Sequence, residues 1–449
     1  MKTSRLIVVQ LMVLCCIYTS CSYGQPLNKI AGGLNFPLKV SDDKHYLTLQ
    51  DGTPFYYVAD TQWPLFWYYS MEEAKRIIDD RVNKGFTGLQ LSLASWRNQR
   101  NKNGHSPFID PVQLTPDTAY FNHADMVLDY MASKGLVAYL PVLWFNQYPK
   151  ASSEANFTFG KWLGTRWKDR ANIIWVVGGD TPFRPDQLPI FTSLASGIKS
   201  SGANQLFTQH PHGGDIPSSG ISSSAGFHNE MWLDFNSIQA HTDSSLSLQN
   251  KMYADYNRKP TKPVLYAEGW YYWLDGQPLF NIHKGSYDIR KAHYISRLAG
   301  SFGEGYGAYP FWWGTKGWEE ALGNQSAATH IATYMKRLFE PREWHKLRPD
   351  FSRDLIINRA LNLRGLDEIA VATSPSRDLA IIYFPRRTEI QINKKWFSGK
   401  IYPKWYDPTI GTYTKAKALK SSGNTKFSPP GKNNNGEDDF VLILETKPR

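Results

Sequence analysis

Two acidic residues each follow an apolar run, and this spacing could bring two carboxyl groups to one site. Asp180 closes "IIWVVGGD" (173–180), and Glu268 comes near the end of "PVLYAEG" (263–269). A carboxyl group at the end of a buried strand loses hydration, which raises its pKa, and a second carboxylate nearby raises one of the two further. One acid can then stay protonated while the other stays ionised, and hydrolysis of an acetal requires that asymmetry.

Other residues compete with this interpretation. An Asp after two glycines often forms a turn or caps a helix, although Gly178 and Gly179 could also let a ligand approach the backbone beside Asp180. Asp60, in "FYYVADT" (55–61), could bind a polar ligand or cap the next segment. Glu230 is expected in a solvated loop, and Glu304 is expected before the last strand, at the wrong end for a shared site.

Eight short apolar runs have the length of buried strands. Most of the segments between them have helical character, and this alternation is typical of a parallel sheet. Eight strand–helix units in series predict an α/β fold, a (β/α)8 TIM barrel. The alternative is an open doubly wound sheet, but "ADTQWP" stands after the first run where such folds carry a Gly-rich turn. The runs are 55–61, 88–94, 136–144, 173–180, 206–212, 237–242, 263–269 and 307–314.

The expected helices carry recognisable start and stop signals. Ser70 and Glu73 form a capping box before the first helix, and Gly85 is a C-terminal stop. The connection after the fifth run is Gly/Ser-rich and has only a short helical stretch near 228–233. The helical segments are 74–85, 120–135, 187–202, 247–259, 287–300 and 326–340.

The pattern changes near residue 350. The segments 368–385, 388–393, 400–413 and 439–447 read as short strands with Pro, Gly and Asn turns between them. They predict a small all-β sandwich domain after the barrel. We therefore expect a signal peptide at 1–24, an N-terminal lead-in at 25–45, the barrel at 46–348 and the β-sandwich at 349–449.

Active sites of such barrels form at the carboxyl ends of the strands. The predicted strands deliver carboxylates, imidazoles, amides and indoles to that end, which suits a polar, ring-shaped ligand. Indole rings that stack on the C–H faces of a sugar would explain why aromatic residues make up 14% of the chain. Besides Asp180 and Glu268, the candidate ligand-binding residues are Asp60, Trp63, Gln90, Trp144, His210, His212, Gln239, His241, Trp270, Trp312 and Trp313, with Trp96 and Asn146 nearby.

The histidines admit a second interpretation. His210, His212 and His241 could hold a metal, since a His-x-His pair is typical of metal-dependent hydrolases, although those carry it on the first strand. Hydrogen bonding to ligand hydroxyls is the simpler role, and we predict no metal and no cofactor. No Gly-x-Ser-x-Gly elbow follows a strand, which argues against an esterase.

The formal net charge is +11, and the sequence pI is about 9.2. No compact Lys/Arg block, zinc pattern or helix-turn-helix accompanies this charge, so nucleic acid is not the expected partner. A diffuse basic surface suits an acidic polysaccharide such as pectin, or has no specific partner at all.

The N-terminal segment predicts export. Lys2 and Arg5 precede the apolar run 6–18, which is too short for a membrane span. Cleavage could follow Gly24, or a lipoprotein-type site could leave Cys21 lipidated, which would be the only membrane attachment. All three cysteines lie in this segment, so the mature chain has no internal disulfide. We expect the periplasm or cell surface of a bacterium, or secretion.

Four barrel motifs in order resemble a known family. "DGTPFYYVADTQWPLF" (51–66), "RVNKGFTGLQLSLA" (81–94), "IIWVVGGDTP" (173–182) and "KPVLYAEGWY" (262–271) are similar to glycoside hydrolase family 140, the apiosidase-like enzymes. "WYDPTIGTY" (405–413) and "DFVLIL" (439–444) are similar to the small domain that follows the barrel there.

The resemblance implies a retaining hydrolase that acts on side chains of the pectic polysaccharide rhamnogalacturonan II and releases apiose-linked sugar from galacturonic acid. It implies that Asp180 is the acid/base and Glu268 the nucleophile. Related barrel glycosidases commonly place Asn before a Glu acid/base. Here Gly179 precedes Asp180, so Gln239 or His210 is expected to supply the missing sugar contact. The alternatives are a glycosidase of other sugar specificity and a non-catalytic carbohydrate-binding protein of the cell surface.

Overall fold

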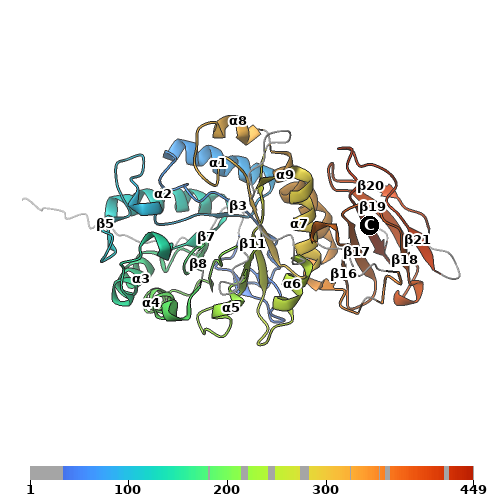
Figure 1. Ribbon diagram of the computed structural model, residues 1–449, viewed down its shortest axis with the longest axis horizontal. Helices are drawn as coiled ribbons and strands as arrows, with labels where there is room; N and C mark the ends of the chain where they lie inside the picture. The colour runs from blue at the N-terminus through green and yellow to red at the C-terminus, as the bar shows by residue number, and fades with distance from the viewer. Residues whose placement is uncertain are drawn as a thin grey trace, which may run out of the picture.

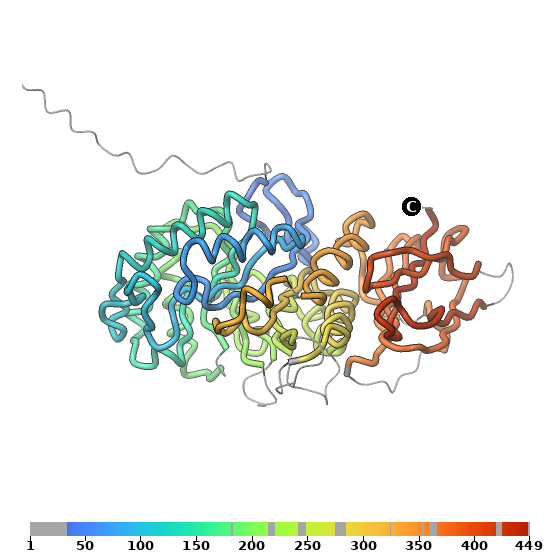
Figure 2. Tube along the Cα trace, turned by 90° about the horizontal axis from the view of Figure 1, so that it is seen from above, coloured from blue at the N-terminus to red at the C-terminus, as the bar shows by residue number. Residues whose placement is uncertain are grey.

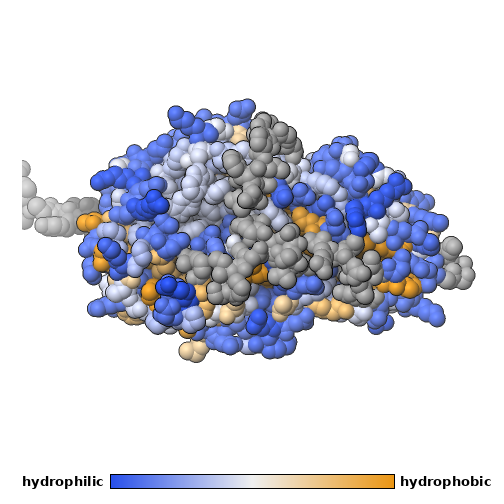
Figure 3. Space-filling model, viewed as in Figure 1, coloured by the Kyte–Doolittle hydropathy of each residue, from blue (hydrophilic) through white to orange (hydrophobic). Residues whose placement is uncertain are grey.

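The computed structural model describes residues 34–180, 183–213, 221–240, 248–273, 283–323, 325–352, 354–358, 365–418 and 424–447. The predicted signal peptide, Cys21 and His241 lie outside these ranges. The chain forms a helix-surrounded barrel followed by an antiparallel β part, which lies at one end of the molecule beyond α7 and α9 (Figures 1 and 2). The face seen in Figure 3 is largely hydrophilic, with apolar side chains in scattered groups.

Eight parallel strands form the barrel, as the sequence predicted. Neighbours in sequence are neighbours in the sheet, and the last strand pairs with the first through five residue pairs. Between the fifth and sixth strands no ladder is formed by the described residues, but the amide of Asp234 donates to the carbonyl of Phe207 at 2.9 Å. The strands are β3 (Tyr57–Thr61), β4 (Gly88–Gln90), β7 (Val137–Pro141), β8 (Ile173–Val176), β9 (Phe207–Thr208), β10 (Asn236–Gln239), β11 (Val264–Glu268) and β14 (Gly303–Gly307).

The helices cover the outside of the barrel. The capping box at Ser70 is confirmed, and Gly85 ends the first helix with φ 96°. The third helix was not predicted. It carries Gly160 and Gly164, which are poor helix formers, and they face the backbone of the next helix. The helices are α1 (Met71–Lys84), α2 (Thr118–Ser133), α3 (Ser153–Trp167), α4 (Leu188–Lys199), α5 (Ser224–Phe227), α6 (Leu248–Tyr256), α7 (Ser286–Leu298), α8 (Trp318–Gly323), α9 (Ser326–Thr329), a π-helical turn (His330–Met335) and α10 (Lys336–Phe339).

Two predicted positions were wrong. The eighth strand is β14 at 303–307, earlier than the apolar run 307–314, because its inward positions are glycines and most of the apolar residues belong to the loop that follows. Glu304 therefore lies within this strand, where it is buried and paired with Arg297 of α7. Burial raises the pKa of Glu304 to about 7. The short helix after the fifth strand is α5 (Ser224–Phe227), before the predicted stretch at 228–233.

The N-terminal lead-in closes the floor of the barrel. Its short hairpin pairs β1 (Lys39–Val40) with β2 (Leu47–Thr48). Phe36, Leu38 and Leu47 join one hydrophobic cluster with residues at the amino ends of the barrel strands, such as Tyr57 and Phe302. The opposite end, where the strands finish, is left for a site. Two further short pairs lie in the loops: β5 (Phe108–Asp110) with β6 (Thr115–Pro116), and β12 (Tyr271–Tyr272) with β13 (His283–Lys284).

The C-terminal part is all antiparallel β, as predicted. Its small sheet contributes Ile390, Ile392 and Phe427 to a core shared with one face of its large sheet. The other face of the large sheet, including Ile381 and Ile443, joins the main core of the barrel helices. The large sheet is ordered β15 (Arg348–Pro349), β16 (Ala370–Thr373), β17 (Leu379–Phe384), β22 (Phe440–Glu445), β19 (Tyr402–Asp407) and β20 (Thr412–Lys415), and the small sheet pairs β18 (Ile390–Ile392) with β21 (Thr425–Phe427).

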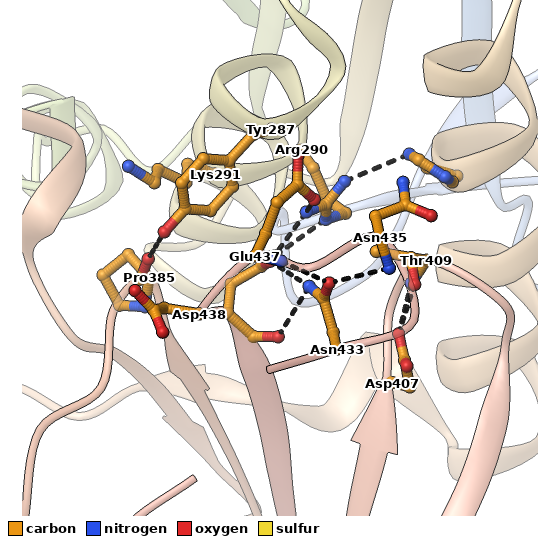
Figure 4. A network of polar contacts seen from close by, with 12 residues as sticks. Tyr287, Arg290, Lys291, Pro385, Asp407, Thr409, Asn433, Asn435, Glu437 and Asp438 are labelled. Carbon is orange, nitrogen blue, oxygen red and sulfur yellow. Dashed lines mark hydrogen bonds and ion pairs between the residues drawn. The ribbon is translucent and has the colours of Figure 1, made fainter. Parts of the chain in front are cut away.

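A buried arginine joins the two parts. Arg290 of α7 has no exposed surface, and its guanidinium donates to both carboxylate oxygens of Asp439 at 2.7 and 2.6 Å. It also donates to Glu437 at 2.5 Å, as Figure 4 shows. The ring of Tyr294 stacks on Tyr383 at 4.7 Å. Among the described residues no helix is long and apolar enough to cross a membrane.

Arg290→Met should destabilise the protein strongly. It leaves the Asp439 carboxylate buried without its cation, and breaking a buried pair in this way costs about 3–5 kcal/mol. Thermal unfolding measures the loss. Lys426→Met is the matched control, because its ion pair with Glu389 is more than half exposed and should contribute nothing measurable. Equal melting temperatures for the two variants would contradict the role of Arg290.

Candidate active site

A pocket of about 500 Å³ opens at the carboxyl ends of the barrel strands. Both predicted acids line it, together with aromatic and amide side chains from the loops after five strands. Its lining residues are Trp63, Trp96, Arg97, Gln99, Trp144, Asn146, Gln147, Asp180, Glu268, Tyr271, Trp312 and Trp313.

Glu268 is the last residue of β11 and is only 5% exposed. Its two carboxylate oxygens have different partners. Oε2 lies 2.7 Å from His210 Nε2, and Oε1 accepts from the Tyr271 hydroxyl at 2.6 Å. Burial raises the pKa of Tyr271 well above its ordinary value, so this hydroxyl remains a donor. Trp63 Nε1 in turn donates to the Tyr271 oxygen at 3.1 Å. Two donors thus stabilise an ionised Glu268 in a nearly closed environment.

Asp180 follows β8 and is more exposed than Glu268. Its Oδ1 lies 2.6 Å from His212 Nδ1, and the two side chains are 32% and 24% exposed. The hydrogen bond to Asp180 raises the pKa of His212 above its ordinary value. This carboxyl and imidazole are close enough to share a proton.

One short segment after β9 therefore contacts both Glu268 and Asp180. His210 and His212 stand two residues apart just after β9, and each contacts a different carboxylate. No group of three His, Cys, Asp or Glu side chains that could hold a metal occurs within the described ranges, and the third histidine of the metal hypothesis, His241, lies outside them.

The two glycines before Asp180 make room for aromatic rings of the protein. This corrects the expectation that they clear space for a ligand. A β-carbon on Gly179 would stand 2.4 Å from the indole of Trp144. Gly178 has φ 85°, and a β-carbon there would stand 2.6 Å from the ring of Phe191. Gly179 thus allows the Trp144 indole, which lines the pocket, to pack directly beside Asp180, and Gly178 makes room for Phe191.

Six aromatic side chains form a chain of ring contacts along the pocket. The first pair is stacked, with centroids 4.7 Å apart, and the later contacts run from 4.7 to 5.9 Å. The hydrogen bond from Trp63 to Tyr271 joins its two ends. Such a wall suits the flat, C–H-rich face of a ring-shaped ligand. The order of contacts is Tyr271, Trp312, Trp313, Trp96, Trp144 and Trp63.

Arg97 brings a positive charge to the lining of this pocket. It is exposed, and no other lysine or arginine is among the described lining residues. Arg97 and the next residue, Asn98, have φ of 52° and 57°, which is uncommon for residues other than glycine. The Asn98 amide holds this backbone in place, because it donates to the carbonyl of Phe108 and accepts from its amide.

Several of the other sequence candidates lie elsewhere. Asp60 faces the helices, where Arg81 Nε and Gln62 Nε2 donate to it at 2.5 and 2.6 Å. Gln90 lies inside the barrel and donates to the carbonyl of Ala267 at 2.6 Å. Gln239 and Trp270 do not line the pocket either. Gln239 is fully buried, and Trp270 is partly buried and packs against the main core.

Of the predicted aromatic residues, Trp63, Trp144, Trp312 and Trp313 line the pocket with the two acids. The sequence interpretation missed Arg97, Gln99, Gln147 and Tyr271. Tyr271 has a usable signal, since it follows Glu268 by three residues in an aromatic run. The other three lie in rim loops, where no periodicity shows which side chains turn inward.

Comparisons with known proteins agree with this architecture. Residues 41–346 match the family described as "Apiosidase-like, catalytic domain", and residues 353–445 match the "Putative collagen-binding domain of a collagenase". The fold is similar to that of a Bacteroides vulgatus protein described as a glycoside hydrolase family 5 member, with TM-score 0.79, 23% identity and coverage of 91% of this chain and 93% of that one. A second structure, described as a glycoside hydrolase, has TM-score 0.78 and 24% identity, and the match covers 92% of this chain and 97% of that one. No curated protein matches the sequence.

Gly179→Ala should disturb the pocket wall. The new β-carbon forces the Trp144 indole to move, and overpacking of this kind costs about 1–3 kcal/mol. Chemical denaturation measures the free energy of unfolding. Gly323→Ala is the control, because among the described residues no heavy atom outside its own helix and chain neighbours lies within 4 Å of a β-carbon there. If both variants keep wild-type stability, Trp144 does not depend on the glycine.

Proposed function

The chain belongs to the apiosidase-like catalytic-domain family, and from that premise we propose that it is a retaining glycoside hydrolase of plant pectin. Family membership and the glycoside-hydrolase fold support a glycosidase. The finer proposal, in line with the resemblance to glycoside hydrolase family 140, is cleavage of apiose–galacturonic acid linkages in side chains of rhamnogalacturonan II. The observation that carries the proposal is that Asp180 and Glu268 line one pocket, each held by its own histidine.

In the first step, Asp180 acts as the general acid. Its proton passes to the glycosidic oxygen while the bond from that oxygen to the anomeric carbon breaks, and a Glu268 oxygen attacks the anomeric carbon. The leaving group departs as an alcohol, and the sugar remains as an ester of Glu268. In the second step, Asp180 takes a proton from water, the water oxygen attacks the anomeric carbon, and Glu268 leaves as a carboxylate. This route requires carboxyl groups about 5 Å apart.

The environments of the two acids suit these different roles. Glu268 must be ionised before it attacks and must leave again, and the donors His210 and Tyr271 favour both because they stabilise negative charge on its oxygens. Asp180 must give and then recover a proton. Its pairing with His212, at the more exposed edge of the pocket, provides a second site where that proton can reside.

The sugar contact that was expected from Gln239 or His210 must be made by another residue. His210 Nε2 already contacts Glu268, and Gln239 does not line the pocket. The amides of Gln99, Asn146 and Gln147 do line it, and we propose that one of them binds a substrate hydroxyl.

The pectic character of the substrate is supported by Arg97. Arg97 lines the same pocket as the two acids. A guanidinium forms paired hydrogen bonds to a carboxylate, the group that distinguishes galacturonic acid from neutral sugars. The partner proposed is therefore a pectic polysaccharide or oligosaccharide, bound against the aromatic wall with its acid group toward Arg97.

We also propose export to the periplasm, the cell surface or the medium. The support is the charged start and apolar run of the first 24 residues, with Cys21 as the possible lipid anchor.

The decisive experiment uses pectic oligosaccharides, with their uronic carboxyl groups intact or reduced to alcohols. The wild type should release apiose-linked sugar from the intact substrates and act less well on the reduced ones. Proton NMR should show a first-formed product with the anomeric configuration of the substrate. Glu268→Gln should lower the rate by about 10⁴-fold or more. Binding without turnover by the wild type would favour the non-catalytic alternative, and a native rate for Glu268→Gln would remove Glu268 as nucleophile.

His212→Asn should change the pH dependence of kcat/KM. Because the pKa of His212 is raised, the Asp180–His212 pair keeps its proton to higher pH than Asp180 alone, and activity falls as pH rises through that pKa. Without the imidazole, the alkaline limb of the profile should move to lower pH. His105→Asn is the matched control, since His105 pairs with Asp117 at 3.0 Å but does not line the pocket. An alkaline limb at the wild-type position would show that Asp180 holds its proton without His212.

A further inference from the structure

Tyr139 lies inside the barrel directly behind the histidine that contacts Glu268. It is the third residue of β7, and neither it nor His210 has exposed surface. The Tyr139 hydroxyl lies 3.2 Å from His210 Nδ1 and 3.3 Å from Ser237 Oγ. The other ring nitrogen of His210 lies 2.7 Å from Glu268 Oε2. Tyr139, His210 and Glu268 thus form a line from the barrel interior to the pocket.

The chemistry of each group fixes the direction of the hydrogen bonds. An ionised carboxylate can only accept, so His210 Nε2 must carry a proton when Glu268 is charged. A neutral imidazole then has a lone pair at Nδ1, which needs a donor. Burial raises the pKa of Tyr139, so its hydroxyl keeps its hydrogen. The Tyr139 hydroxyl is therefore the donor to Nδ1.

Ser237 does not need the hydrogen of Tyr139. Its own hydroxyl can donate to Thr208 Oγ1, 3.0 Å away. Thr208 is itself satisfied, because it donates to the carbonyl of Phe235 at 2.8 Å. Each of the three hydroxyls, on Thr208, Ser237 and Tyr139, then has an acceptor for its one hydrogen. The hydrogen of Tyr139 is the one that remains for His210.

We propose that Tyr139 is a positioning residue for the nucleophile: its hydroxyl holds His210 in the Nε2–H tautomer, so that the ring always presents a donor to Glu268. The role given to Glu268 rests on the proposed function. Without the hydroxyl, His210 can place its proton on Nδ1. The Nε2 lone pair then faces the Glu268 carboxylate, and the repulsion is relieved when a proton enters between the two groups. Where Glu268 holds that proton, it is disabled as a nucleophile.

The surroundings of His210 limit what else could set its protonation. Among the described residues, the titratable side chains in hydrogen-bond contact with its ring are Glu268 from β11 and Tyr139 from β7. Its ring also contacts the rings of Trp63 and Trp144, with centroids 5.4 and 6.4 Å away, and these do not titrate. Tyr271 and the Asp180–His212 pair act on this histidine only through Glu268 or across the pocket.

The kinetic test is Tyr139→Phe, which removes one oxygen and keeps the ring. On rhamnogalacturonan II oligosaccharides, kcat/KM should fall about 5-fold, the size of one hydrogen bond. The acidic limb of its pH profile should move to higher pH by about 0.5 to 1 unit. Tyr57→Phe is the matched control, since Tyr57 is equally buried in the barrel interior but its hydroxyl makes no hydrogen bond among the described residues. A Tyr139→Phe profile that overlays the wild type would overturn the proposal.

A double mutant separates this role from simple packing. If Tyr139 acts through His210, then His210→Gln and the combined Tyr139→Phe/His210→Gln variant should have the same kcat/KM. Losses that multiply in the combined variant would show that Tyr139 acts independently of the histidine, and the proposal would fail.

A spectroscopic readout needs no substrate. With ¹⁵N-labelled histidine, the signals of His210 are those that disappear in His210→Gln, and their shifts distinguish the two tautomers and the imidazolium. The wild type should show the Nε2–H tautomer, and Tyr139→Phe should shift toward Nδ1–H. An imidazolium or an Nδ1–H ring in the wild type would overturn the proposal. A protein that cleaves no pectic substrate would refute the proposed function but leave this measurement decisive for the tautomer.

Discussion

An ionised carboxylate at the end of a buried strand must be compensated by hydrogen-bond donors, and the mouth of this barrel is organised around that requirement. Glu268 receives a hydrogen bond at each oxygen, from His210 and from Tyr271. Each donor depends on another group behind it: Tyr139 on one side, Trp63 on the other. Because these supports come from different strands, the acid is stabilised only when the barrel is complete.

The sequence predicted the barrel and the position of the two acids at the carboxyl ends of its strands, because both features depend on local signals. Apolar runs mark buried strands, and an acid that ends such a run must reach the carboxyl edge. Sequence patterns could not predict which way the side chains point near the carboxyl edge of the strands. Asp60 turns toward α1 to meet Arg81, and Gln90 turns into the barrel toward Ala267, although Asp60 is the next-to-last residue of β3 and Gln90 is the last of β4. Contacts between distant segments decided their positions.

The sequence-based prediction was also wrong where a strand carries glycines in place of apolar residues. β14 carries glycines at alternate positions and therefore lacks an apolar run, so the prediction shifted to the aromatic loop after it. A β-carbon on Gly305 would stand 2.1 Å from the side-chain amide of Gln90, which shows why the strand cannot carry larger inward residues. In α3, Gly160 and Gly164 allow close packing on α4 at the expense of helix propensity. In both β14 and α3, tight packing requires glycines, and these glycines interrupt the apolar and helical patterns from which strands and helices are predicted.

The hairpin that seals the barrel floor lies at the opposite end of the strands from the pocket. Phe36, Leu38 and Leu47 pack beneath the amino ends of the strands, whereas the pocket opens at the other end of the same strands. A tether that reached the protein through its N-terminal segment would hold it by the base. The entrance would then lie on the side of the protein that faces away from the point of attachment.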